Sequence, residues 1–134
     1  MSRSFLGIGG DRRGVGLIEF AFAAPILLAG IIGAAQLGTL FFANAGLRSS
    51  VAEGARYATT YPQPTDSQII ERMASKRFGP RAAVAGTPLI TSGVADSAGW
   101  IQISQTSSVS MNFIFFQKTV ILTETRRAFV YPTY

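Results

Sequence analysis

The feature that most constrains this chain is its charge-free run, which extends from Phe20 to Leu47. Its polar interruptions are mild: Gln36, Thr39 and Asn44. About 20 apolar helical residues cross a hydrocarbon core of about 30 Å. A chain of 134 residues has material for about one domain, and burying so long a helix on all sides in it would be difficult. The run therefore predicts a transmembrane helix in preference to the buried helix of a soluble core.

The residues that flank the run predict its orientation. Three arginines and one aspartate precede it within residues 1–14, whereas Arg48 and Arg56 after it are accompanied by Glu53. Cytoplasmic flanks carry the excess of Lys and Arg. We therefore expect a cytoplasmic N-terminus, with the residues after about 50 on the far side of the membrane.

Three modes of export compete for this segment. The pair Arg12-Arg13 suggests a twin-arginine signal, with nothing beyond the pair to support it. Ala43-Asn44-Ala45 has the form of a signal-peptidase site, and cleavage after Ala45 would release a secreted soluble binding domain. An ordinary signal peptide has an apolar stretch of only 7–15 residues, which disfavours that alternative. The third mode is an anchor that stays, with processing in front of the apolar run.

A short motif at the entrance of the run points to this third mode. A basic leader ends in Gly14, and Val15 follows it. Glu19 comes five residues after the glycine, directly before Phe20. This spacing resembles the processing site of type IVb (Flp-type) prepilins and pseudopilins. The resemblance implies that a prepilin peptidase cleaves between Gly14 and Val15, so that Glu19 becomes the fifth residue of the mature chain.

A physical role for Glu19 can be stated independently of the resemblance. An ionised carboxylate inside the apolar edge of a membrane costs on the order of 2–3 kcal/mol, so it requires a partner. The new α-amino group of Val15 on a neighbouring subunit is such a partner, and the pair would fix the axial register. The alternative is a solvated Glu19 at the headgroup boundary.

Two further stretches extend the resemblance. Residues 20–28, which include Pro25, are similar to the "EFA…P" opening of TadE-like proteins, and residues 52–58 are similar to their "REGARYA" stretch, with Ala52 in place of the arginine. The motifs cover about residues 10–60. They identify the chain as resembling a TadE-like minor pilin or pseudopilin of the tight-adherence (Flp, type IVb) pilus system.

The resemblance implies a structural, non-enzymatic role in the assembly or initiation of such a pilus. The implied partners are the prepilin peptidase, other pilin and pseudopilin subunits, the pilus assembly machinery and membrane lipid. The implied location is the bacterial inner membrane, crossed once, with the C-terminal domain in the periplasm. Incorporation into the surface pilus is a further option of the family.

Side-chain patterns within the run predict how the helix packs. Pro25 lacks an amide hydrogen and clashes one turn back, so it should kink the helix. Gly30, Ala34 and Gly38 recur at four-residue spacing and form a face of small residues that lets another helix approach closely. The alternative is that Gly and Ala are simply common in membrane helices.

The sequence predicts three regions: a basic leader (1–14), a transmembrane and stalk helix (15–60) and a small periplasmic domain (61–134). In the domain, a capping box at residues 65–68 begins a short helix that we expect to pack on a sheet. Alternation predicts strands near 89–91, 100–105, 109–116 and 119–130. The fold class is therefore α+β, a long helix followed by a small helix and an antiparallel sheet. We expect the aromatic residues at 113, 115 and 116 to lie in the core.

The amino-acid composition excludes several kinds of catalytic and metal-binding site. The chain has no His and no Cys, which excludes histidine acid–base catalysis, cysteine nucleophiles, disulfides and the usual zinc sites. The carboxylates after the run are scattered over different elements. We therefore expect no catalytic residues, no metal, no cofactor and no small-molecule substrate. The net charge of +5 includes the arginines of the leader, so it does not predict nucleic-acid binding. A small signal-anchored enzyme that uses Glu71, Asp96 or Glu124 is the remaining alternative.

Overall fold

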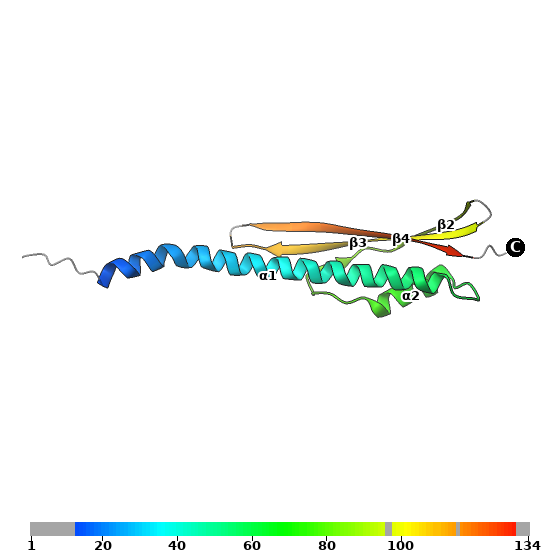
Figure 1. Ribbon diagram of the computed structural model, residues 1–134, viewed down its shortest axis with the longest axis horizontal. Coiled ribbons are helices and arrows are strands. Elements are labelled where there is room, and N and C mark those ends of the chain that lie inside the picture. The colour runs from blue at the N-terminus through cyan, green and yellow to red at the C-terminus, as the bar shows by residue number, and fades with distance from the viewer. Residues whose placement is uncertain (1–12, 96–97, 115, 131–134) are drawn as a thin grey trace, which may run out of the picture.

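A computed structural model of the chain describes residues 13–95, 98–114 and 116–130. Within these residues the elements are α1 (Arg13–Ala58), α2 (Asp66–Lys76), β1 (Ala83–Ala85), β2 (Leu89–Ala95), β3 (Ala98–Asn112) and β4 (Gln117–Val130). The predicted α+β arrangement is confirmed. Figure 1 shows α1 along the length of the molecule, with the sheet and α2 beside its second half. Residues 1–12 of the predicted leader (1–14) lie outside the described residues.

Helix α1 has 46 residues, which corresponds to about 70 Å at 1.5 Å per residue. It continues through Pro25 without interruption. At its end the amides of Thr59 and Thr60 donate to carbonyls three residues earlier, and the prolines at 62 and 64 follow. The predicted helix over residues 15–60 is therefore found within two residues at each end.

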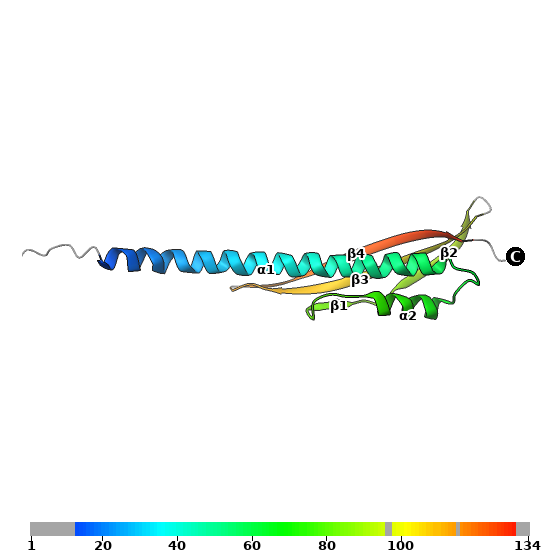
Figure 2. The same cartoon turned by 60° about the horizontal axis from the view of Figure 1, so that its bottom comes forward.

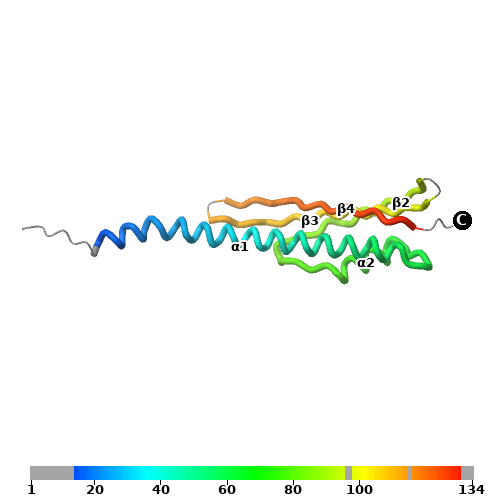
Figure 3. The backbone as a smooth tube through the Cα atoms, in the orientation of Figure 1, coloured from blue at the N-terminus to red at the C-terminus, as the bar shows by residue number. Residues whose placement is uncertain are grey.

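The sheet is organised around β3. Strands β1 and β2 both pair with one edge of β3, and β4 pairs with the other edge, all antiparallel (Figure 3). The register sets Val109 opposite Val120 and Ile103 opposite Ile90. The prediction of two strands at 100–105 and 109–116 is wrong, because β3 is continuous. Its buried face includes Gln105 and Ser107, and these polar residues interrupt the apolar alternation that the prediction relied on.

The core lies where α1, α2 and the sheet meet. One cluster contains Leu47, Val51 and Ala58 of α1, Ile69 and Met73 of α2, and Ile101 and Ile103 of β3. A second contains Ala43, Val109 and Met111. Helix α2 packs mainly against α1 rather than on the sheet, which differs from the prediction. A methyl group placed on Gly54 would lie 2.5 Å from Met73 Cγ, so the small Gly54 permits this close helix contact.

The sheet begins to cover α1 near the middle of the helix (Figure 2). The Gln36 side chain donates to the carbonyl of Asn112, at the end of β3, over 3.0 Å. Before this contact most of the large apolar side chains of α1 are more than half exposed, whereas Ile32 is partly buried. Helix α1 thus consists of a bare half, residues 13–35, and a packed half, residues 36–58. No break in the helix separates them.

The aromatic residues that follow β3 differ from the prediction. Phe113 is half-buried and borders the second core cluster. Phe116 is 58% exposed and is not a core residue. The prediction for Phe115 lies outside the described residues. Phe113 and Phe116 stack on each other with ring centres 4.6 Å apart, at the end of the β3–β4 hairpin.

Candidate functional site

The residues of the predicted processing motif lie together at the start of α1. Gly14 and Val15 are in the first turn, and Glu19 and Phe20 follow in the next, with all four exposed. A methyl group placed on Gly14 would meet no atom of the described residues within 4 Å. Val15 and Glu19 are four residues apart and therefore share one face of the helix. The described part of this chain leaves the motif accessible to another protein.

The bare half of α1 has the properties of a membrane span. Glu19 is the only charged residue between Gly14 and Leu47. By length and composition α1 could cross a membrane once, and its most apolar stretch is not buried by the described residues. This is consistent with a single-pass membrane protein. A carboxylate at the entrance of such a span requires a partner or water.

The predicted face of small residues is open. Gly30, Ala34 and Gly38 are all exposed, and nothing lies within 4 Å of a methyl group placed on either glycine. Gly38 comes two residues after Gln36, which is a rotation of about 200° around the helix. Since Gln36 contacts the sheet, Gly38 faces away from it. A second helix could therefore reach this face without displacing the domain.

Pro25 lies inside the bare half, where its effect on backbone bonding is local. It has no amide hydrogen to donate to the carbonyl of Ala21, one turn earlier. The helix nevertheless continues on both sides. The kink predicted at Pro25 stays a prediction, as does the pairing of Glu19 with a subunit N-terminus.

An ionic cluster on the packed half fixes α2 to α1. Arg56 donates through Nε and Nη2 to the two oxygens of Glu53, each over 2.9 Å, as the spacing predicts. Arg72 of α2 donates to the same carboxylate over 2.9 Å. Its guanidinium also lies 5.9 Å from the centre of the Tyr57 ring. The hydrogen bonds from Arg56 and Arg72 lower the pKa of Glu53 to about 2, although partial burial opposes them.

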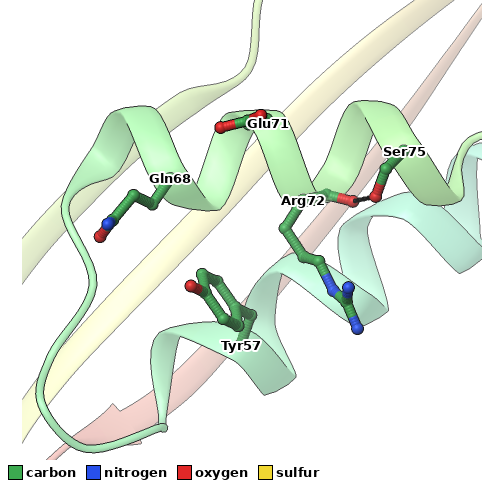
Figure 4. Close-up of a pocket in the computed structure, with 5 residues that line it drawn as sticks. All are labelled: Tyr57, Gln68, Glu71, Arg72 and Ser75. Carbon is green, nitrogen blue, oxygen red and sulfur yellow. Dashed lines mark hydrogen bonds between the residues drawn. The ribbon is translucent and has the colours of Figure 1, made fainter.

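An open hollow of about 330 Å³ lies beside this cluster, between the end of α1 and α2 (Figure 4). It is lined by Tyr57, Gln68, Glu71, Arg72 and Ser75. The Ser75 hydroxyl donates to the carbonyl of Arg72, and the Arg72 guanidinium is engaged by Glu53. The hollow therefore presents one carboxylate, Glu71, beside a hydroxyl and a guanidinium that already have partners within the protein.

The carboxylates of the enzyme alternative do not converge in the described residues. Glu71 lies on α2, whereas Glu124 lies on β4, 3.6 Å from Arg48 and 3.1 Å from Arg126. Asp96 is outside the described residues. Within the described ranges there is also no group of three acidic, His or Cys residues that could hold a metal ion.

Comparison with known proteins identifies the long helix. The family model of TadE-like proteins matches residues 14–56. No curated protein and no solved structure matches the chain. The family match begins at the predicted processing glycine and ends at Arg56, inside the stretch that resembled "REGARYA". It indicates a protein associated with the tight-adherence pilus. The resemblance seen in the sequence is therefore confirmed over residues 14–56, where this chain is similar to TadE-like proteins.

Proposed function

We propose that this protein is a minor pilin or pseudopilin of a tight-adherence pilus, with a structural and non-catalytic role in pilus assembly or initiation. The observation that carries the proposal is the processing motif at the start of a bare apolar helix that matches the TadE-like family. The helix anchors the protein in the bacterial inner membrane, and the packed domain lies in the periplasm.

The length of the bare half supports the anchor. Residues 15–35 extend for about 30 Å as a helix, which matches the hydrocarbon thickness of a bilayer. The arginines before Gly14 favour the cytoplasmic side for the N-terminus. The packed half of α1 then carries the sheet and α2 at and beyond the far edge of the membrane.

The proposed mechanism begins with cleavage by a prepilin peptidase between Gly14 and Val15. The new α-amino group of Val15 pairs with Glu19 of a neighbouring subunit, which compensates the charge of both groups inside the membrane. The face formed by Gly30, Ala34 and Gly38 lets the helices of neighbouring pilin subunits approach closely. Together the two contacts set the axial position and the separation of the subunits.

The decisive experiment is the intact mass and N-terminal sequence of the protein from bacterial membranes, with and without the prepilin peptidase. We expect a chain that starts at Val15 only when the peptidase is present. We expect Glu19→Ala to be cleaved but to fail in assembly. An uncut chain in the presence of the peptidase would contradict the proposal.

A soluble product that starts at Gly46 would instead support the secreted binding domain. The packing disfavours that product. Cleavage after Ala45 would remove Leu40 and Ala43, which pack in the cluster that contains Val109 and Met111. The remaining sheet would then expose apolar side chains that are buried in the intact chain.

A further inference from the structure

The β3–β4 hairpin ends beside the midpoint of α1, at the junction of the bare and packed halves (Figures 1 and 2). The amide of Phe113 donates to the carbonyl of Phe116 over 2.8 Å and closes the hairpin. The Gln36 side chain holds the hairpin end to α1 through the Asn112 carbonyl. The bond from Gln36 therefore fixes the position of the tip along the helix axis.

The tip is apolar and largely uncovered. Ile114 is 50% exposed and Phe116 is 58% exposed, and Phe116 stacks on the half-buried Phe113. On α1, Leu37 and Phe41 are also more than half exposed just beyond Gln36. Exposed apolar side chains are thus present on both the helix and the hairpin close to the Gln36–Asn112 contact. Leaving such side chains in water is unfavourable in proportion to their area.

The level of the tip coincides with the edge of the membrane. If the span begins at Phe20, directly after the charge of Glu19, then about 20 helical residues bring it to Thr39 at the far side. Gln36 lies just inside this limit. Helix α1 has no charged residue between Glu19 and Arg48. No charge in this part of the helix therefore opposes the placement of Gln36 in the apolar layer.

We propose that the hairpin tip, formed by Phe113, Ile114 and Phe116, is a second membrane contact that inserts into the interfacial layer of the leaflet from which α1 emerges. The inference rests on the membrane anchor of the proposed function. Phe and aliphatic side chains of membrane-surface segments bury favourably at the boundary between headgroups and acyl chains. Lys118, the first charged residue after the tip, is exposed and can extend its ammonium group to the headgroups.

The bond between Gln36 and Asn112 is consistent with a lipid environment for this end of the hairpin. A side-chain amide in the apolar layer requires an internal partner because lipid offers none, and the Asn112 carbonyl is such a partner. With two points of contact, α1 and the hairpin, the rotation of the helix about its axis becomes fixed relative to the membrane. A single helix has no comparable restraint.

The test uses single cysteines in the full chain, which has no native Cys. Three exposed phenylalanines give matched variants: Phe22→Cys in the bare half, Phe116→Cys at the tip and Phe129→Cys at the far end of β4. Each is labelled with an environment-sensitive fluorophore and reconstituted into phosphatidylethanolamine–phosphatidylglycerol vesicles. Quenching is then measured with lipids that carry a quencher near the headgroup or at the acyl terminus, and with aqueous iodide.

We expect the label at residue 22 to be quenched most by the deep lipid quencher. The label at 116 should be quenched most by the shallow one, and the label at 129 by iodide alone. If 22 behaves as expected but 116 matches 129, the tip proposal is overturned and the anchor stands. A label at 116 that is shielded from iodide and from both lipids would reveal a protein contact and would also overturn it. If lipid does not quench residue 22, the anchor itself fails, and the tip proposal fails with it.

Discussion

Arg72 of α2 donates to the Glu53 carboxylate of α1 over 2.9 Å, and this bond joins two residues nineteen positions apart in the chain. The same carboxylate accepts two hydrogen bonds from Arg56. One carboxylate thus bonds two guanidinium groups, and its bond with Arg72 fixes the position of α2 along α1. The contact lies in the packed half, well away from the predicted membrane span.

This cluster predicts an acid-dependent loss of stability. The pKa of Glu53 is about 2, below its ordinary value of 4.5, so the folded state holds the carboxylate in its ionised form more strongly than the unfolded state. The stability gained is complete above pH 4.5 and is lost as the pH falls toward 2. Glu53→Gln should therefore be less stable than the wild type at pH 7, with a difference that disappears near pH 2.

The measurement is denaturant unfolding from pH 7 to pH 2, followed by the fluorescence of Trp100, the one tryptophan of the chain. Glu71→Gln is the control, because Glu71 is an exposed glutamate on the same helix as Arg72. It should change stability by less than about 0.5 kcal/mol. A difference between wild type and Glu53→Gln that stays constant with pH would contradict the assignment.

The buried Gln105 predicts a second effect on stability. Its amide donates to the Gly86 carbonyl over 3.2 Å, and its Oε1 lies 3.4 Å from the hydroxyl of Ser50. Gln105→Leu would leave buried polar groups without this partner, so we expect a loss of about 1–3 kcal/mol. Gln102→Leu makes the same change on the opposite, more exposed face of β3 and should have the smaller effect. Equal losses in thermal or denaturant unfolding would refute a specific role for the buried amide.

The close approach at Gly46 predicts the effect of adding one methyl group. A Cβ at this position would overlap the carbonyl oxygen of Phe78, in the segment after α2. Gly46→Ala should therefore displace that segment and destabilise the fold by about 1–3 kcal/mol. Gly38→Ala is the matched control in the same helix, since its methyl group would meet nothing within 4 Å. If both variants unfold at the same denaturant concentration, the backbone contact at Gly46 is not formed.

The face of small residues predicts a defect in assembly without a defect in folding. Ala34→Ile should hinder close helix association, because the side chain projects from the face shared with Gly30 and Gly38. Ala35→Ile is its matched control, with an equally exposed alanine about 100° further around the helix. Cross-linking between subunits in membranes should fall several-fold for the first variant alone. Equal cross-linking in the two variants would show that this face does not mediate the contact.

Local patterns in the sequence predict the helices well. The capping box at Thr65 is present, with Gln68 Oε1 accepting from the Thr65 amide over 2.9 Å. The pair Glu53–Arg56 is also present. Each depends on residues three positions apart, so its geometry follows from the helix itself.

The contacts that join separate elements could not be predicted in this way. Arg72 on Glu53 and Gln36 on Asn112 connect residues that are distant in the sequence, and no spacing rule relates them. The continuity of β3 was missed for a related reason. Gln105 and Ser107 face the core because they bond to Gly86 and Val84, partners that only the assembled sheet supplies. For the same reason, β1 was not predicted.

The absence of a break between the bare and packed halves of α1 has a mechanical consequence. The domain has no hinge on which to turn against its anchor, so a force applied to the sheet acts along the axis of the helix itself. Lifting the domain by about 5.4 Å would draw one full turn of α1 past the membrane edge. A displacement of the domain along the helix axis therefore moves the proposed membrane anchor by the same distance, one helical turn for about every 5.4 Å.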